Sequence, residues 1–341
     1  MRKILRQVVG VDVDQKKLVV SLGRLLDNLE LEICSHKVFD NGPKGFSALL
    51  SWVDKQVDAR VEVRFVMEAT GVYHESFAYF LDENSRWTSI VLPNKISSYF
   101  RTLDIRTVTD KTASEAIARF GLERNLNKWK RPNPTLKKLK QLTRERDQII
   151  TERTLVKNQL HAEKSEAEPN KSSLQRMEKR IALLAKQEKE IQNEMKIVVE
   201  TDEALKAQIK LGCTIPGVGF LTAAIVLAET NGFEFIRNKR QLTSYAGLDV
   251  KEKQSGTSVK GKPRISKRGN RYLRKALYLP ALAALRSNER YKGIFVRLVS
   301  KHGIKMKAAV AIQRKMLELI YTVIKNRTAY DEHYGGFAKA A

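Results

Sequence analysis

The stretch QVVGVDVD, residues 7–14, predicts a strand, and it carries the carboxylate of Asp12 inside an otherwise apolar run. Similar Val- and Ile-rich runs, each bounded by polar or turn residues, recur at residues 17–22, 31–39, 61–67 and 88–92. Helical patterns follow or separate them at residues 43–56, 72–83 and 112–123. Three early strands, followed by strands that alternate with helices, predict a mixed α/β sheet covered by helices.

The composition indicates a polyanionic partner. The 341 residues contain 63 Lys+Arg against 38 Asp+Glu, which gives a net charge of +25. Nucleic acid is the simplest partner for such a charge. No apolar run is long enough to span a membrane, and no basic amphipathic helix with an anchor favours a membrane surface. Cys34 and Cys213 lie far apart without a Cys/His cluster, so we expect neither a disulfide scaffold nor structural zinc.

The middle of the chain has a different pattern. Residues 135–210 contain few aromatic residues, and apolar residues recur there at alternating three- and four-residue steps. Arg146, Arg153 and Glu188 interrupt this apolar seam, and EPNKSS at residues 168–173 breaks the helix. The pattern predicts either an antiparallel helical hairpin or coiled-coil arms that pair between subunits. The alternative is a solvated helix pair that serves only as a spacer.

The last part is predicted to be helical, with helices at residues 269–287, 289–301 and 304–326. It opens with IPGVG, residues 215–219, which resembles a helix-hairpin-helix element. Gly217 and Gly219 permit a tight turn, after which exposed helix amides can meet a phosphate; a plain packing corner is the alternative. We therefore expect an α/β domain at 1–130, a coiled-coil arm at 131–210, a helical domain at 211–330 and a flexible tail at 331–341.

Three carboxylates are candidates for a metal site. Asp12 lies in the first strand, Glu68 ends the strand at 61–67, and Asp110 begins a helix. Carboxylates from two strand ends and a helix can converge at one edge of a sheet, and such hard oxygen ligands suit Mg²⁺. Taken singly, each acid is better explained as a helix cap or a solvated strand end, whereas the three as an ordered set in a strongly basic α/β chain favour a metal site.

A basic segment surrounds a serine in the last part of the chain. Ser255 lies in QSGTS, and the candidate nucleic-acid-binding cations around it are Lys260, Lys262, Arg264, Lys267, Arg268, Arg271 and Arg274. Such a segment predicts salt-sensitive binding to a phosphate backbone. From the residues alone, a flexible phosphate-binding loop explains the segment better than a nucleophilic serine does, because a serine next to a glycine is common.

Three stretches in order, GVDVD, FVMEATGVYHE and VTDKTASEAIARF, are similar to the RuvC-like, ribonuclease-H-fold domain of DEDD-type insertion-sequence transposases, the bridge-RNA-guided recombinases. The resemblance continues through TIPGVGFLTA, QLTSYAGLD and SGTSVKGKPRISKRGNRYLRKALYLPA, and so covers nearly the whole chain. It implies an α/β plus all-α protein: a RuvC-like domain, a coiled-coil arm and a helical transposase domain.

The resemblance also implies an acidic Mg²⁺ site made by Asp12, Glu68 and Asp110. The family pattern has a fourth acid three residues after the third, where this chain has Ala113. Because one of four ligands is absent, we expect this chain to bind the metal more weakly and to have impaired activity. Residue 113 is alanine either because this copy is naturally inactive or because the acid was deliberately removed.

The resemblance implies that Ser255 attacks a DNA phosphate and forms a covalent phosphoserine, with Thr257 and Ser258 as the nearest competing hydroxyls. The implied partners are donor and target DNA, a structured guide RNA and further copies of the chain in a dimer or tetramer, in the bacterial cytoplasm at the nucleoid. Two rival functions stay open: a metal-dependent nuclease or junction resolvase, and a non-catalytic nucleic-acid-binding protein.

Overall fold

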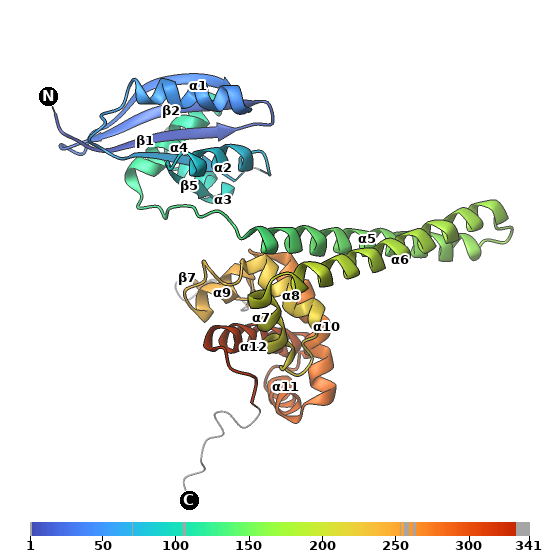
Figure 1. Cartoon of the computed structure of the whole chain (residues 1–341). Helices are drawn as coiled ribbons and strands as arrows, with labels where there is room; N and C mark the ends of the chain where they lie inside the picture. The colour runs from blue at the N-terminus through green and yellow to red at the C-terminus, as the bar shows by residue number, and fades with distance from the viewer. Residues whose placement is uncertain are drawn as a thin grey trace, which may run out of the picture. The chain divides into compact units, whose positions relative to one another are not determined.

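The computed structural model describes residues 2–69, 71–103, 105, 107–252, 254–255, 259–261 and 264–331, and only the backbone of residues 254–255 and 259–260. The chain divides into two compact units, Met1–Arg131 and Pro132–Ala341. Figure 1 shows a sheet with its helices in the first unit, and a long helical arm with a helical body in the second. No described helix is long and apolar enough to cross a membrane.

The first unit is built on a five-stranded mixed sheet, which confirms the expected α/β class. Its order is β3-β2-β1-β4-β5; β1 to β3 are antiparallel, whereas β4 runs parallel to β1 and to β5. The strands are β1 (Ile4–Val13), β2 (Lys17–Leu26), β3 (Leu31–Asp40), β4 (Val63–Glu68) and β5 (Trp87–Val91). The helices are α1 (Pro43–Asp54), α2 (Glu75–Glu83), α3 (Pro93–Phe100) and α4 (Asp110–Glu123).

Helices cover both faces of this sheet. Because side chains alternate along a strand, Val9 and Val11 of β1 join one apolar core with α1 and α2, whereas Val8 joins another with α3 and α4. Figure 1 shows α1 on one side of the sheet and α4 on the other. Both faces of β1 are therefore buried, which explains why its sequence is almost continuously apolar.

Gly10 brings α4 unusually close to β1. A Cβ atom at Gly10 would lie 2.3 Å from the backbone nitrogen of Ala118 and 2.4 Å from the carbonyl oxygen of Ser114. Only glycine permits this approach. Ser114 is buried here and hydrogen-bonds Ser21 of β2 through their hydroxyls, 2.8 Å apart. The position of α4 on the sheet is thus fixed over its first turns.

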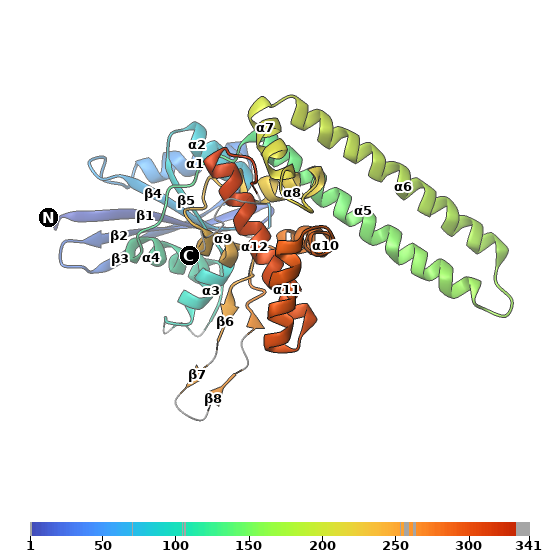
Figure 2. The same cartoon turned by 90° about the horizontal axis from the view of Figure 1, so that it is seen from below.

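The arm consists of two antiparallel helices, α5 (Pro134–Lys164) and α6 (Lys171–Glu200), which lie side by side (Figure 2). Asn133 and Asn170 cap their N-termini with side-chain oxygens. The antiparallel hairpin expected from the sequence is therefore present. The polar interruptions of its seam meet one another: Arg146 and Arg153 each lie 2.6 Å from a carboxylate oxygen of Glu188.

The helical body packs around one apolar core that also includes the root of the arm. Its helices are α7 (Glu203–Cys213), α8 (Phe220–Thr230), α9 (Lys239–Tyr245), α10 (Arg271–Ser287), α11 (Glu289–His302) and α12 (Lys305–Asn326). Two short antiparallel pairs separate α9 from α10: β6 (Val250–Lys251) with β9 (Arg264–Ile265), and β7 (Gln254–Ser255) with β8 (Val259–Lys260).

The sequence missed several short elements, namely α3, α9 and the two-residue strands β6 to β9. It placed α7 at the end of the arm, whereas this helix is separate and belongs to the body's core. Cys34 and Cys213 are free thiols. The expected flexible tail at 331–341 lies, except for Asp331, outside the described residues.

Candidate active site

Two neighbouring parallel strands place Asp12 and Glu68 side by side. The register pairs Val11 of β1 with Met67 of β4, so the next residue on each strand is an acid. Asp12 follows Gly10 by two residues and therefore points to the face covered by α4. Glu68 likewise follows Val66, which packs in the core under α3 and α4. The strands thus direct both carboxylates to the same face.

Asp110 reaches this face from the first turn of α4. Thr109 caps the helix through two reciprocal hydrogen bonds. The Thr109 hydroxyl accepts from the backbone nitrogen of Thr112 at 3.2 Å, and the Thr112 hydroxyl accepts from the backbone nitrogen of Thr109 at 2.8 Å. An acid in the first helical turn is favoured by the helix dipole. Ala113 follows three residues after Asp110 and so lies on the same side of the helix.

The three carboxylates act on one another electrostatically. The pKa of Asp12 is raised to about 6, first by burial and then by the negative charges of Asp110 and Glu68. Among the described residues, no group of three or more acids, histidines or cysteines is close enough to hold a metal as it stands. The donor set still fits a hard divalent cation, since carboxylates that repel one another gain most from a shared positive charge.

Ser255 lies in a β-hairpin that projects from the helical body. Its backbone pairs with Val259, and the hairpin base is closed where Val250 pairs with Ile265 (Figure 2). The hydroxyl of Ser266 donates to Asp249 at 2.5 Å below this base. Thr257, Ser258 and Lys262 lie outside the described residues, and only the backbone of Ser255 and Lys260 is described.

The basic residues after the hairpin fall into two groups. Arg264, Lys267, Arg268 and Arg271 are exposed. Arg274 is instead half-buried, and its Nη1 donates to the carbonyl oxygens of Ala246 at 2.7 Å, Gly269 at 3.3 Å and Asn270 at 3.4 Å. The exposed group is accessible to a phosphate backbone, although Arg271 also donates from its Nη2 to the Tyr272 hydroxyl at 3.2 Å. Arg274 instead holds the hairpin base through its hydrogen bonds.

Gly217 and Gly219 lie in the turn between α7 and α8. Gly217 has a φ of 84°, and a Cβ there would lie 2.5 Å from the carbonyl oxygen of Pro280, so this glycine packs against α10. Gly219 is the N-cap of α8 and has open space around its Cα. Of the two, Gly219 has the geometry that leaves backbone amides accessible.

Sequence reasoning missed a buried acid in the body, Glu229 of α8. Its side chain is fully buried and binds Arg144 and Asn270. The available signal was an acid at the end of the apolar run FLTAAIVLAET, residues 220–230. The same signal singled out Asp12.

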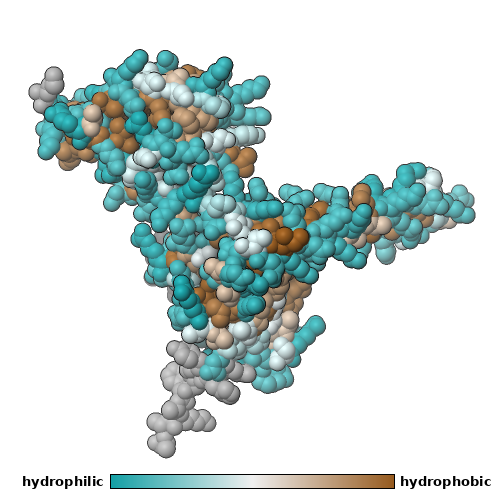
Figure 3. Space-filling view, viewed as in Figure 1, coloured by the Kyte–Doolittle hydropathy of each residue, from teal (hydrophilic) through white to brown (hydrophobic). Residues whose placement is uncertain are grey.

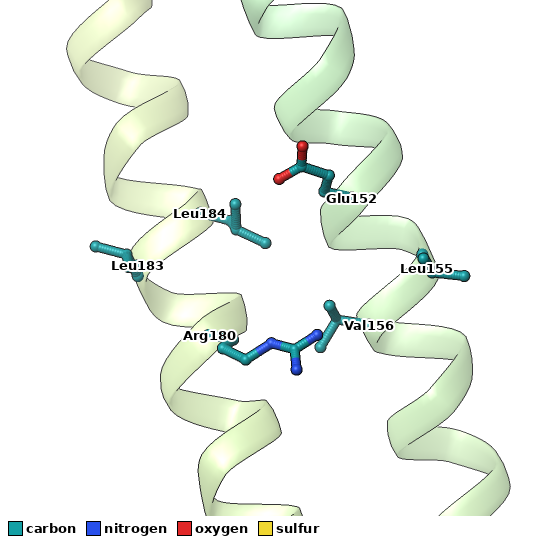
Figure 4. A pocket seen from close by; sticks show the side chains of 6 residues that line it. All are labelled: Glu152, Leu155, Val156, Arg180, Leu183 and Leu184. Atoms are coloured by element: carbon teal, nitrogen blue, oxygen red, sulfur yellow. The ribbon is translucent and has the colours of Figure 1, made fainter.

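A pocket of about 340 Å³ lies on the arm (Figure 4). Val156 and Leu184 point toward each other between the helices, while Leu155 and Leu183 point outward. Leu155 is 58% and Leu183 55% exposed. Figure 3 shows the arm as mainly hydrophilic, with such apolar side chains scattered along it. The lining is mainly apolar, with Glu152 and Arg180 as its two charged residues, and the pocket is a packing feature of the arm.

Two family models match the chain. One for DEDD transposases of the IS110 type matches residues 9–163, which include Asp12, Glu68 and Asp110. Another, Transposase IS116/IS110/IS902 family, matches residues 210–294, which include Ser255 and its basic surroundings. The chain belongs to the IS110 family of DEDD transposases.

Two curated relatives of this IS110-family transposase span most of its length. The pilin gene-inverting proteins of Moraxella bovis and Moraxella lacunata are each 29% identical to it over 301 residues, which is 86% of this chain and 90% of theirs. The transposase for insertion sequence element IS1111A of Coxiella burnetii is 31% identical over 41% of both chains. The family therefore rearranges DNA, and this chain is of the transposase/recombinase type.

Among solved structures, T. thermophilus RuvC in complex with Holliday junction substrate matches 36% of this chain and 99% of its own, at 12% identity and a TM-score of 0.27. That similarity is too low to carry a conclusion about the IS110-family chain. Its fold class follows from the strand order of the first unit and from the family match.

Proposed function

We propose that this transposase cuts and rejoins DNA through a covalent phosphoserine at Ser255, assisted by a divalent metal at the acidic site. The observation that carries the proposal is the placement of Asp12 and Glu68 at neighbouring positions of two paired strands, with Asp110 in the first turn of α4. Burial, followed by the charges of Asp110 and Glu68, raises the pKa of Asp12 to about 6. Perturbed carboxylates of this kind cluster at functional sites. Asp12, Glu68 and Asp110 would hold Mg²⁺, which when bound would polarise the scissile phosphate.

The proposed chemistry is a transesterification. The Ser255 oxygen attacks the phosphorus and loses its proton, the bond from phosphorus to the leaving deoxyribose oxygen breaks, and that oxygen takes up a proton. A hydroxyl of the strand to be joined then attacks the phosphoserine and regenerates Ser255. Arg264, Lys267 and Arg268 are exposed beside the hairpin and would stabilise charge on the phosphate.

The proposal assigns the sequence readout to a structured guide RNA that pairs with donor and target DNA. The protein would then grip backbone and shape through its basic surface, which suits a net charge of +25. Gly219 and the amides at the start of α8 would add a phosphate contact. We place this activity in the bacterial cytoplasm, at the nucleoid.

The acidic site and the serine hairpin lie in different units of the chain. We therefore propose that two copies or more assemble, as a dimer or tetramer, so that the acids of one copy serve the serine of another. We propose that the copies pair through the arm, at the outward-facing positions Leu155 and Leu183.

Ala113 occupies the fourth acidic position, and the proposal is that it disarms this chain. A missing ligand weakens metal binding and chemistry, whereas the basic surface that grips nucleic acid is intact. Two rival functions make different predictions. A nuclease would use water and need Ser255 only for grip, and a non-catalytic binding protein would cleave nothing.

The test uses Ala113→Asp protein with Mg²⁺, guide RNA transcribed from the element's flanks, and labelled donor and target DNA. We expect a DNA–protein adduct that survives denaturing gel electrophoresis, disappears with Ser255→Ala and persists in the matched control Ser258→Ala. Free cleaved DNA that persists with Ser255→Ala would support the nuclease. Tight binding without any reaction would support the non-catalytic protein.

A further inference from the structure

Glu229, in the last turn of α8, is a buried hub of hydrogen bonds in the second unit. Arg144 donates to both of its carboxylate oxygens, through Nε at 2.8 Å and Nη2 at 3.0 Å. Asn270 donates from its Nδ2 to Oε2 at 2.6 Å. The ammonium of Lys140 lies 4.0 Å away, and the Glu229 side chain itself is 0% exposed.

These partners come from parts of the chain with different tasks. Arg144 belongs to α5, near the root of the arm. Asn270 is the N-cap of α10, where the serine hairpin ends, and its side-chain oxygen accepts from the backbone nitrogens of Tyr272 and Leu273. Glu229 thus joins the arm to the C-terminal end of the segment that carries Ser255.

The N-terminal end of the same segment is held at the same place. Tyr245, the last residue of α9, donates its hydroxyl to the carbonyl oxygen of Glu229 at 2.9 Å. Its own carbonyl oxygen accepts from the backbone nitrogen of Asn270 at 2.8 Å. Both ends of residues 246–270 are therefore fastened to Glu229.

The hydrogen-bond donors around Glu229 require a carboxylate at this position. Three N–H donors face its two oxygens, so a carboxylate, which only accepts, satisfies all of them. In Glu229→Gln one oxygen becomes an NH₂ group of nearly the same shape, and this donor would face another donor from Arg144 or Asn270. A buried polar group left unpaired in this way is costly.

We propose that Glu229 is a positioning residue, which fixes the base of the serine hairpin to the root of the arm and thereby sets where Ser255 stands. The inference rests on the proposed role of Ser255. Its consequence is that movement of the arm reaches the hairpin through Arg144 and Glu229. Glu229 contacts no DNA in this scheme; its carboxylate acts through Asn270, whose backbone nitrogen donates to the carbonyl oxygen of Tyr245.

Three variants of the full chain isolate this effect. Glu229→Gln removes the acceptor. Asn270→Ser keeps an N-cap side chain for α10 but loses the amide that reaches Glu229. Glu188→Gln is the matched control, because Glu188 is also a buried acid between two arginines, yet it lies within the arm and makes no contact with the hairpin base.

The first measurement is hydrogen exchange by mass spectrometry, which requires no activity. We expect Glu229→Gln and Asn270→Ser to speed exchange about tenfold in peptides spanning 246–252 and 264–271, since local opening controls exchange. Glu188→Gln should affect only the arm. Unchanged exchange at both ends of the hairpin in Asn270→Ser, or in folded Glu229→Gln, would overturn the proposal.

The second measurement uses the Ala113→Asp background. We expect Glu229→Gln to slow single-turnover adduct formation at least tenfold while the Kd for DNA stays within twofold; equal rates would overturn the positioning role. An absence of adduct in the Ala113→Asp parent would instead reject the proposed function. The exchange result would then decide by itself whether Glu229 fixes the hairpin base.

Discussion

Arg146 and Glu188 face each other across the arm with Nη2 and Oε1 2.6 Å apart, at the point where both apolar seams are interrupted. Arg153 binds the other oxygen of Glu188 at 2.6 Å. One acid on α6 thus forms ion pairs with two arginines that lie one heptad apart on α5. A shift of α5 along α6 would bury these charges against apolar side chains. The triad of Arg146, Arg153 and Glu188 therefore fixes the register between the two helices of the arm.

The triad gives a prediction about stability. Glu188→Ala leaves two partly buried guanidiniums without their acid and should cost about 2 kcal/mol of unfolding free energy. The triple replacement of Arg146, Arg153 and Glu188 by leucine should recover most of that loss, because an apolar seam needs no pairing. Urea denaturation of the purified variants checks both. An unchanged unfolding free energy in Glu188→Ala would show that the packing of α5 against α6 does not depend on these three residues.

The acidic site predicts a pH dependence. The folded pKa of Asp12, about 6, lies above the value of about 3.9 in an unfolded chain, so folding favours the protonated form. Its contribution to stability is therefore greatest below pH 4 and is lost as the pH rises through 6. Asp12→Asn should stabilise the metal-free protein at pH 8 by about 1 kcal/mol, after allowance for solvent screening, and hardly at all at pH 4.

Thermal melts in EDTA across pH 4 to 8 measure this effect. Asp40→Asn, which removes an exposed acid at the end of β3, is the control for loss of a carboxylate. A greater gain for Asp12→Asn at pH 4 than at pH 8 would contradict the assigned direction of the pKa shift.

Restoring the fourth acid should create metal-dependent stability. Ala113→Asp places a carboxylate one turn after Asp110, which increases repulsion and should lower the Tm in EDTA. Millimolar Mg²⁺ should reverse the loss and raise the Tm above that of the parent chain. Ala113→Asn, of the same shape without the charge, should show neither effect. Equal Mg²⁺ responses in Asp and Asn variants would show that residue 113 is not a ligand position.

Two neighbouring arginines should behave differently. Arg271 is exposed, so Arg271→Ala should weaken DNA binding and lower the slope of log K against log salt by about one, with little change in Tm. Arg274 braces three carbonyl groups, so Arg274→Ala should cost about 1 to 3 kcal/mol of stability. Salt titrations by fluorescence anisotropy, alongside thermal melts, separate the two. The same result for both would contradict this division.

The arm should take part in self-association. Leu155→Glu with Leu183→Glu places charges on two outward apolar positions and should shift the protein toward monomer by at least tenfold in dissociation constant. Lys179→Glu, an exposed change on the same helix as Leu183, is the control. Sedimentation equilibrium measures the result. Unchanged association in the double variant would place the subunit contact elsewhere.

Local signals carried much of the fold. The helices at 271–287, 289–302 and 305–326 lie within two residues of their predicted bounds, and the first two begin after the capping residues Asn270 and Asn288. The strands of the first unit were predicted from short Val- and Ile-rich runs, of which β1, with valines on both faces, is the clearest. Two-residue strands such as β7 carry no such periodicity, and α3 is only eight residues long and opens with Pro93.

The site was predictable only where its residues stand at element ends. Asp12, Glu68 and Asp110 were singled out as candidates because an acid in or at the end of a buried strand, or at a helix start, is conspicuous. Glu229 was missed because its partners Arg144 and Asn270 lie 85 and 41 residues away. Arg274 was counted among the DNA-binding cations because no sequence pattern shows that a basic side chain turns inward to backbone carbonyls.

The central claim is that Ser255 becomes covalently linked to DNA. The direct measurement is mass spectrometry of the Ala113→Asp protein after reaction with Mg²⁺, guide RNA and DNA, followed by nuclease trimming and proteolysis. The account predicts a phosphate or nucleotide adduct on the peptide that contains Ser255, with fragment ions that place it on that residue. An adduct on Thr257, Ser258 or Tyr272, or cleaved DNA with no modified peptide, would contradict it.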